Sequence, residues 1–305
     1  MERTHHAGDA NDAQIADDAA HTQHTQHTPT IDRYASERVR HDLVRRTLQV
    51  VRTEYVATNL LRITLSGDEL HGFVSAAFDD HVKIFLPKPG ERIPTLPSVE
   101  DIVNKRFVPG SERPIARDYT PRRYDAVTNE LDIEFVIHGD GPGSSWAAQA
   151  KVGDPLIVAG PRGSFIVSDN FDWYLLVGDE TAFPAIARRI ETLPADASAL
   201  VIISATDAAS LPTWAGQAHP RPNVRVLSVL SAMQSPAHAD DALLEAVRKQ
   251  TLPTGIGHAW VAAESTTAKH IRQHLVAERG FDKHHIRAAS YWRQGEKSFH
   301  EALDD

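Results

Sequence analysis

The sequence predicts a β-barrel domain followed by an α/β domain, and three observations support this. Short β-rich runs separated by turn residues fill residues 41–168, which is typical of a small antiparallel barrel. Strand-like and helical stretches alternate through residues 169–305, which indicates a five-stranded parallel sheet with helices on both faces. The chain of 305 residues is long enough for two domains of about 150 residues each.

Residues 1–40 are polar, rich in His, Asp, Thr and Gln, and contain the repeat HTQHTQHT. A segment of this composition buries no core, so we expect a disordered, His-rich tail. Histidines there could hold a metal only loosely, because a disordered tail lacks the fixed partners that orient metal ligands. We therefore expect a solvated tail and no metal site. The histidines concerned are His5, His6, His21, His24 and His27.

Six β-rich runs make up the expected barrel. They are RTLQVVRTEYV, LRITLSG, HVKIFLP, RDYTPRRYD, LDIEFVIHG and PLIVAGPRGSFIV. Leu131, Ile133, Phe135 and Ile137 recur at every second position, with Asp132 and Glu134 between them, so this strand should have one buried face. The run SSWAAQAK predicts one short helix between strands, and residues 87–114, rich in proline and charge, predict a long loop.

The α/β domain is expected from five strands, WYLLVGD, ALVIISATD, NVRVLSVL, HAWVAAE and HIRAASYW. Three helical stretches separate them, TAFPAIARRIETL, DDALLEAVRKQTL and TTAKHIRQHLVAERG. Ligands of such sheets bind at the carboxyl ends of the strands. Here those ends are Gly178-Asp179-Glu180, Ala205-Thr206-Asp207 and Ala263-Glu264.

Composition narrows the function. The chain has no cysteine, which excludes disulfides, thiolate nucleophiles and cysteine-ligated iron–sulfur clusters, so redox chemistry here requires an organic cofactor. The formal net charge of -9 argues against a general nucleic-acid binder. No apolar run approaches the ~18 residues of a membrane span, and the start lacks the apolar core of a signal peptide. We therefore expect a soluble, cytoplasmic protein.

The segment Arg117-Asp118-Tyr119-Thr120 resembles the R-x-Y-[ST] flavin motif of the ferredoxin–NADP reductase superfamily. A tyrosine ring can stack on an isoalloxazine, an arginine can pair with a pyrophosphate, and a threonine hydroxyl can bond the flavin edge. Four residues alone are a weak pattern, because an arginine and a tyrosine on one strand are more often surface and core neighbours.

A second segment, after the next strand, strengthens the flavin interpretation. Gly141-Pro142-Gly143-Ser144 resembles the second phosphate-binding segment of the same superfamily, which opens a short helix. Backbone N–H groups at a helix start and a serine hydroxyl suit a diphosphate. A glycine-rich turn with serine as helix cap explains the same residues, and the two interpretations are compatible.

A wider set of segments resembles the siderophore-interacting proteins, which are FAD-dependent ferric-siderophore reductases. The segments are DDHVKIFLP, RDYTPR, FVIHGDGPGSSWA, GDPLIVAGPRGSF, GDETAFPAI and the terminal ASYWRQG, and the resemblance covers about residues 43–295. It implies a flavin-binding barrel followed by a nucleotide-binding α/β domain. It also implies that electrons pass from NADPH or NADH through FAD to an Fe(III)–siderophore, which releases Fe(II) for iron acquisition.

The same resemblance implies a set of FAD-binding residues. They are Arg117, Tyr119, Thr120, His138, Gly141, Gly143, Ser144 and Thr181. The first three would hold the flavin ring and phosphates, the next four would line the pyrophosphate, and the last would face the flavin or the nicotinamide.

Three cations match the family positions that receive the siderophore, namely Lys83, Arg162 and Arg287. Together they would attract an anionic ferric siderophore. Each also has a structural explanation: Lys83 can extend to water from an apolar strand, Arg162 can be solvated in a turn, and Arg287 can cover the sheet edge. No acid–base catalyst is expected, because reducing the iron requires positioning, stacking and charge.

Two departures from the family pattern concern the electron donor. Ala263-Glu264 stands where the family often has glycine before this glutamate, so the alanine methyl could narrow the nicotinamide pocket. The strand end Ala205-Thr206-Asp207 offers no arginine for a 2′-phosphate, and Asp207 would repel one. NADPH, NADH and ferredoxin, which some relatives use, therefore all stay open as donors.

Three other functions fit parts of the pattern. An esterase that opens the siderophore would need G-x-S-x-G, and the nearest stretch, GPGSSWA, lacks the final glycine. A non-catalytic siderophore- or flavin-binding protein would present the same binding residues. A flavin reductase with ferredoxin or a quinone as partner also fits, although the three cations favour an anionic acceptor. A monomer is the simplest oligomeric state.

Overall fold

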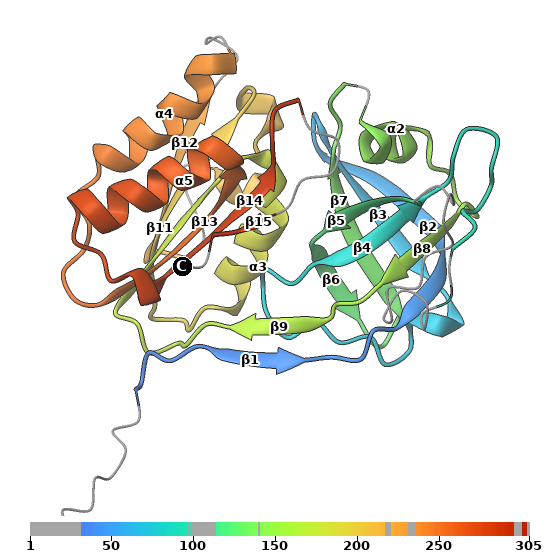
Figure 1. Ribbon diagram of the computed structural model, residues 1–305, viewed down its shortest axis with the longest axis horizontal. Helices are drawn as coiled ribbons and strands as arrows, with labels where there is room; N and C mark the ends of the chain where they lie inside the picture. Colours follow the sequence, from blue (N-terminus) through green and yellow to red (C-terminus); the bar gives the residue numbers. More distant parts are fainter. Residues whose placement is uncertain are drawn as a thin grey trace, which may run out of the picture. The chain divides into compact units, whose positions relative to one another are not determined.

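The computed structural model describes residues 32–96, 98, 114–139, 141–216, 221–230, 236–295 and 301–303, with residues 236–241 and 301 described by their backbone only. The chain divides into two compact units, Met1–Asp32 and Arg33–Asp305, and every element below belongs to the second (Figure 1). The histidines expected in the tail, and most of the loop expected at 87–114, lie outside the described residues. In the part of the chain that is described, no helix is long and apolar enough to cross a membrane.

An antiparallel sheet of seven strands forms the first domain. Its strands are β2 (Arg45–Ala57), β3 (Leu60–Ser66), β4 (Val82–Leu86), β5 (Ile115–Tyr119), β6 (Pro121–Asp125), β7 (Glu130–Val136) and β8 (Pro155–Ala159). They lie in the order β5-β4-β8-β2-β3-β7-β6, which leaves β5 and β6 at the edges. The predicted antiparallel fold is confirmed, as a half-barrel.

Proline divides two of the runs that the sequence pattern treated as single strands. RDYTPRRYD forms both β5 and β6, and PLIVAGPRGSFIV forms β8 and a further strand, β9 (Gly163–Ile166). Pro121 and Pro161 carry no N–H group, so neither can donate to a continuing ladder. The RDYT segment therefore lies at the end of an edge strand, with Tyr119 as its last residue and Thr120 directly after it.

A parallel sheet forms the second domain. Its strands are β10 (Trp173–Gly178), β11 (Ser198–Ala205), β12 (Val224–Leu230), β13 (Gly257–Glu264), β14 (Ile286–Trp292) and β15 (Glu301–Ala302). The order is β12-β11-β10-β13-β14-β15. The first five strands in this order are parallel, as predicted, and β15 is a short antiparallel addition beside β14.

Helices cover both faces of the parallel sheet (Figure 1). They are α3 (Phe183–Thr192), α4 (Pro236–Arg248) and α5 (Ser265–Gln273), the last continued by a π-helical turn (His274–Glu278). Helix α3 packs on the face that carries Tyr174 and Leu176, whereas α4 and α5 pack on the face that carries Leu175 and Val177. Short 3₁₀ turns lie at Asp68–Leu70, Glu180–Ala182, Ala208–Ser210, Thr213–Ala215 and Lys283–His285.

Strand β1 (Glu37–Arg40) pairs antiparallel with β9 in a two-stranded sheet of their own (Figure 1). It lies within the stretch that composition assigned to the tail. The two strands approach so closely that a Cβ added at Gly163 would lie 2.6 Å from the carbonyl oxygen of Val39. β9 follows the last barrel strand and precedes β10. The two-stranded sheet of β1 and β9, the β1–β9 ribbon, is therefore part of the connection between the two domains.

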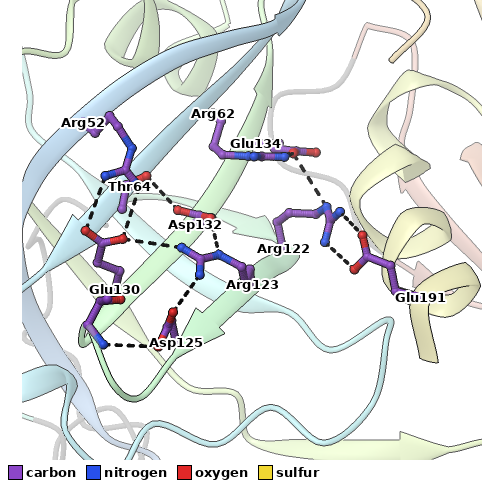
Figure 2. A network of polar contacts seen from close by, with 11 residues as sticks. Arg52, Arg62, Thr64, Arg122, Arg123, Asp125, Glu130, Asp132, Glu134 and Glu191 are labelled. Carbon is purple, nitrogen blue, oxygen red and sulfur yellow. Dashed lines mark hydrogen bonds and ion pairs between the residues drawn. The ribbon is translucent and has the colours of Figure 1, made fainter. Parts of the chain in front are cut away.

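Strand β7 is buried on both faces, so the expectation of a single buried face was wrong. Its apolar side chains fill the barrel core. Its acidic side chains are covered by arginines: Arg62 Nη2 lies 2.5 Å from Glu134 Oε1, and Arg123 Nε lies 2.8 Å from Asp132 Oδ2 (Figure 2). Alternation correctly predicted the apolar face, but ion pairs from neighbouring strands also removed the polar face from water.

Arg122 extends this network to the second domain (Figure 2). Its guanidinium lies 3.7 Å from Glu134 and 2.5 Å from Glu191 of helix α3. Arg188, also on α3, donates a hydrogen bond of 2.8 Å to the carbonyl of Pro121. Arginines from both domains therefore hold α3 against strand β6.

Glu134 and Glu191 allow a matched test, because both pair with Arg122 but their side chains are 3% and 58% exposed. Glu134→Gln should lower the free energy of unfolding by about 3 kcal/mol, because two arginines lose their carboxylate in a desolvated site. Glu191→Gln should cost less than about 1 kcal/mol, because exposed ion pairs contribute little. Urea unfolding of both variants checks this, and equal losses would contradict it.

His258 is a buried, uncharged histidine on β13. Its ring lies 5.2 Å from that of Phe171, centroid to centroid. Burial lowers the pKa of His258 to about 3, with smaller contributions in the same direction from the positive charges of Arg189, His285 and Arg287. The folded protein therefore keeps this ring neutral at neutral and mildly acidic pH.

Acid should weaken the fold through His258. In the unfolded chain this residue regains a pKa near 6.5, so protons favour unfolding as the pH falls below that value. The stabilisation is complete above about pH 6.5, and about 2 kcal/mol of it should be lost by about pH 5. His258→Gln should remove this part of the pH dependence, whereas His284→Gln, at an exposed position, should keep it. Urea unfolding at both pH values measures the difference, and identical pH profiles for the two variants would refute the assignment.

Candidate functional site

Strand β5 carries the RDYT segment along the edge of the barrel sheet. Tyr119 packs against Phe135, with ring centroids 4.4 Å apart, and burial raises the pKa of its hydroxyl. Arg117 Nη1 donates a hydrogen bond of 2.7 Å to the carbonyl of Ala116, and the buried Thr120 follows the strand. Because side chains alternate along a strand, Arg117 and Tyr119 project from the same face of β5.

The GPGS segment opens helix α2 (Pro142–Gln149), the short helix that the sequence predicted. Gly141 is its N-cap, and no side chain among the described residues caps it. Ser144 Oγ accepts a hydrogen bond of 2.9 Å from the backbone N–H of His138, which ties the end of β7 to the helix. The first N–H groups of α2 therefore lack a side-chain acceptor, an arrangement that suits phosphate oxygens.

Gly143 brings the two segments together. It is buried, and a Cβ added to it would collide with the hydroxyl oxygen of Tyr119. Glycine is therefore required for the start of α2 to lie against the Tyr119 ring. An uncapped helix start beside an aromatic ring matches what FAD presents, since the cofactor carries a pyrophosphate and a flat isoalloxazine. The residues present fit this cofactor.

Asp179 connects strand ends of the parallel sheet through hydrogen bonds to its carboxylate. Its carboxylate accepts hydrogen bonds from the N–H and hydroxyl of Thr181 at 2.9 and 2.5 Å, and from the N–H of Glu264 at 3.0 Å. The indole of Trp292, 41% exposed, donates a fourth at 2.8 Å. Burial raises the pKa of Asp179, and the bonds from Thr181 and Trp292 oppose this shift. The structure thus places Thr181 beside the terminal Tyr-Trp-Arg segment, and Asp179 is the residue that links them.

Two other acidic residues at the strand ends cap backbone turns. Glu264 accepts a hydrogen bond of 2.6 Å from the N–H of Thr266 at the start of α5. Asp207 accepts one of 2.9 Å from the N–H of Ser210 in the turn after β11. Both carboxylates therefore hold local structure at the edge where a nucleotide would bind.

Lys83 lies on β4 directly opposite Asp118 of β5, and its Nζ is 2.7 Å from the Asp118 carboxylate. The residue opposite Tyr119 is Val82. Because side chains alternate, Lys83 and Asp118 project to the opposite face of this ladder from Arg117 and Tyr119. The structure therefore brings Lys83 to the same end of the ladder as the RDYT segment, but not to the same face.

Arg287 reaches from β14 to the barrel. Its Nε lies 2.5 Å from the Asp79 carboxylate, and its guanidinium carbon lies 4.4 Å from the ring centroid of Phe165. Asp79 also accepts a hydrogen bond of 3.1 Å from the indole of Trp260, while its other oxygen is buried without a partner among the described residues. Sequence reasoning missed Asp79, and its one signal was its place in the family-like segment DDHVKIFLP.

The three sequence-predicted cations border one short stretch between β8 and β9. Lys83 is opposite Ala159 at the end of β8, and Arg287 lies over Phe165 of β9. Arg162 lies in the turn between these strands, where its exposed guanidinium has no partner among the described residues. The three cations therefore lie along one stretch of chain, with Lys83 opposite the end of β8, Arg162 in the turn and Arg287 over β9.

Tyr291 connects this region to the RDYT segment. It shares a hydrogen bond with Thr120, and burial together with the nearby charge of Asp79 raises its pKa. The end of β5 and the Asp79–Arg287 pair therefore meet at Tyr291, on the strand that carries the terminal Tyr-Trp-Arg segment.

The fold and the site together define a class of protein. The ferredoxin–NADP+ reductase of Plasmodium falciparum has the same fold, with a TM-score of 0.59 at 12% identity over 79% of this chain and 94% of that one. The family model described as the siderophore-interacting FAD-binding domain matches residues 49–165, which span most of the half-barrel and α2. The protein is an FAD-dependent oxidoreductase with a ferredoxin reductase-like fold.

Similarity extends over both domains. The family model described as siderophore-interacting protein matches residues 171–295. The NADPH-dependent ferric-chelate reductase of Escherichia coli (strain K12) is 37% identical over 261 residues, which is 84% of this chain and 96% of that protein. The crystal structure of a siderophore utilization protein from T. fusca matches with a TM-score of 0.76 at 37% identity, over 86% of this chain and 97% of that one. The chain belongs to the siderophore-interacting protein family, which confirms the resemblance seen in the sequence.

Gly143→Ala tests the contact between α2 and Tyr119. The added methyl group should displace one of them and weaken FAD binding by about tenfold or more, because overpacking costs about 1–3 kcal/mol. Alanine is the better helix former, so α2 itself should not be lost. Titration with FAD, followed by quenching of flavin fluorescence, measures the affinity. Ala148→Ser, at an exposed position of the same helix, is the control, and equal FAD affinity in the two variants would argue against the contact.

Proposed function

We propose that the protein is an NADPH-dependent ferric-siderophore reductase, which passes electrons through FAD to an Fe(III)–siderophore and releases Fe(II). One observation carries this proposal. The flavin-type segment of β5 and the Asp79–Arg287 pair meet at Tyr291, so a flavin and an anionic iron chelate bound at these places would be neighbours. The name of the E. coli relative, an NADPH-dependent ferric-chelate reductase, supports the same donor and acceptor.

The proposed FAD-binding residues come from strand β5, helix α2, the 3₁₀ turn at Glu180–Ala182 and the loops beside them. They are Arg117, Tyr119, Thr120, His138, Gly141, Gly143, Ser144 and Thr181. Arg117 would pair with phosphate and the Tyr119 ring would stack on the isoalloxazine. The uncapped N–H groups at the start of α2 would donate to the pyrophosphate, with Ser144 holding the loop after β7 in place.

When bound, FAD accepts two electrons from a nicotinamide and gives them up singly, as ferric iron requires. The residues of the chain contribute positioning and charge rather than proton transfer. Burial raises the pKa of Tyr119, so its hydroxyl stays protonated and neutral beside the flavin. We assign no acid–base catalyst. Iron leaves after reduction because the hard oxygen ligands of a siderophore hold Fe(II) less tightly than Fe(III).

We propose that Lys83, Arg162 and Arg287 receive the anionic groups of the siderophore. Cations placed along one segment of chain would raise the local concentration of anions, even in a protein with a net charge of -9. Arg162 offers an unpartnered guanidinium within the described structure, and Lys83 is half-exposed. Both are therefore accessible to a ligand that approaches from solvent.

The proposal of NADPH as electron donor rests on the name of the E. coli relative, and not on a phosphate-binding residue of this chain. The end of β11 presents Asp207, whose carboxylate is held by the N–H of Ser210, and no arginine stands beside it in the sequence. NADH and ferredoxin are the alternative donors. Because NADPH is a cytoplasmic metabolite, the proposal places the reaction in the cytoplasm.

An absorbance spectrum of the purified protein loaded with FAD tests the proposal. Under anaerobic conditions NADPH should bleach the flavin band, and ferric citrate or ferric enterobactin should then restore it. Bleaching by NADH alone would change the donor, and bleaching by neither nucleotide would favour ferredoxin or a non-catalytic carrier. A bleached band that no iron chelate restores would indicate another acceptor, such as a quinone. A protein that takes up no FAD would overturn the proposed function.

A further inference from the structure

We propose that Asp79 is an FAD-binding residue, whose Oδ1 accepts a hydrogen bond from an N–H or O–H group of the bound flavin and whose negative charge makes that flavin a stronger reductant. This inference rests on the FAD binding of the proposed function and deepens it, because it assigns a residue that holds the cofactor and tunes its redox potential. Asp79 lies outside both segments that resemble flavin motifs, RDYT and GPGS.

The carboxylate of Asp79 is buried but only half satisfied. Its side chain is 5% exposed, and its Oδ2 accepts hydrogen bonds from Arg287 Nε at 2.5 Å and Trp260 Nε1 at 3.1 Å. Its Oδ1 is buried and has no partner among the described residues. A buried carboxylate oxygen without a donor is costly, so native structures almost always supply one. We therefore expect a bound molecule to provide the donor for Oδ1.

The polar groups around Asp79 are engaged elsewhere. Trp260 and Arg287 are direct partners in the β13–β14 ladder, so both project from one face and donate to the same oxygen. The charge of Asp79 also acts on Arg188, but the guanidinium of Arg188 donates to the carbonyl of Pro121. These three side chains therefore leave Oδ1 unpaired.

Asp79 lies close to the end of the flavin-type segment on β5. Burial raises the pKa of Tyr291, with a smaller contribution from the charge of Asp79, and a hydrogen bond with Thr120 opposes the shift. Thr120 directly follows Tyr119, whose ring would stack on the isoalloxazine. Tyr291 is thus within reach of the charge of Asp79 on one side and bonded to the flavin-type segment on the other.

FAD carries donors of the kind that Oδ1 lacks. Its isoalloxazine has an N–H group at the ring edge, and its ribityl chain has hydroxyl groups. A carboxylate oxygen accepts from either kind of donor, and such charge-assisted hydrogen bonds are stronger than neutral ones. The cofactor of the proposed function therefore matches the missing partner of Asp79.

The charge of Asp79 also bears on the redox potential of the flavin. Reduction adds negative charge to a flavin, so a neighbouring carboxylate opposes it and lowers the potential. The hard oxygen ligands of a siderophore favour Fe(III) over Fe(II), which makes the iron hard to reduce. A flavin of lower potential reduces such iron more readily. Arg287, paired with Asp79, acts in the opposite direction, so the two residues together set the potential.

Asp79→Asn tests both parts of the inference. Trp260 and Arg287 both require an acceptor, so the new amide oxygen should take the place of Oδ2 and the amide nitrogen that of Oδ1. A donor would then face the donor of the flavin, and the negative charge would be gone. Titration with FAD, followed by quenching of flavin fluorescence, gives Kd. Reduction in equilibrium with dyes of known potential gives the midpoint potential of the bound flavin.

Asp79→Asn should raise Kd for oxidised FAD about tenfold, because a hydrogen bond to a charged acceptor is lost. It should also raise the preference for reduced over oxidised FAD about tenfold, the effect of one unit charge a few ångströms away in a partly desolvated site. For a two-electron couple this corresponds to a midpoint potential about 30 mV higher.

Two further variants separate the charge of Asp79 from the loss of its ion pair. Arg287→Gln breaks the same ion pair but leaves the negative charge, so the potential should shift downward. Asp169→Asn removes a carboxylate from a different ion pair, 3.0 Å from Arg189, at the amino end of β10. It should leave both Kd and the potential at the wild-type values.

Unchanged Kd and potential in Asp79→Asn would overturn the inference and indicate an ordered water at Oδ1, with the proposed function still standing. Shifts of the same sign in Asp79→Asn and Arg287→Gln would also overturn it, because loss of the ion pair would then be the cause. If Asp79→Asn does not fold, an unchanged potential in Arg287→Gln refutes the role of the charge. The expected shifts in a protein that reduces no iron chelate would uphold the inference and overturn the proposed acceptor. A wild-type protein that takes up no FAD would overturn both proposals.

Discussion

The buried carboxylate of Asp79 joins the antiparallel sheet to the parallel sheet. It precedes β4, and it accepts hydrogen bonds from Trp260 of β13 and Arg287 of β14. A carboxylate removed from water depends on such partners, because the loss of one would leave an uncompensated buried charge. The bond between Tyr291 and Thr120 lies beside it. Through these contacts the flavin-type segment and the strand ends of the second domain keep their relative positions.

A second connection runs through helix α3. Arg122 of β6 pairs with Glu191 of α3, and Arg188 of α3 donates to the backbone of β6. Desolvation lowers the pKa of Arg188, and the charges of Asp80 and Asp79 oppose this shift. Two sets of polar contacts therefore hold the two domains together, one centred on Asp79 and one on helix α3. A site built from strands and helix ends in this way is positioned more precisely than one built on loops.

Electrostatics of the candidate site differ from those of the whole chain. The net charge is -9, yet three cations lie along β8, β9 and the turn between them. Two of them form ion pairs, Lys83 with Asp118 and Arg287 with Asp79. These ion pairs hold the two side chains in place without a ligand. An anionic acceptor would thus meet a site that is already organised and only moderately positive, which favours binding that is specific yet reversible.

The sequence by itself determined the order and type of the domains, because hydrophobic period and turn residues are local properties that survive in any fold of this class. It also identified the RDYT and GPGS segments. The close contact between Gly143 and Tyr119 explains why the GPGS segment requires glycine at this position. Tertiary structure decided the rest. The burial of Asp132 and Glu134, the face from which Lys83 projects, and the roles of Asp79 and Asp179 all follow from strand register. Arg38 was assigned to a tail by composition, and only pairing with β9 placed it over Phe165. Such contacts join residues far apart in the chain, so no local pattern encodes them.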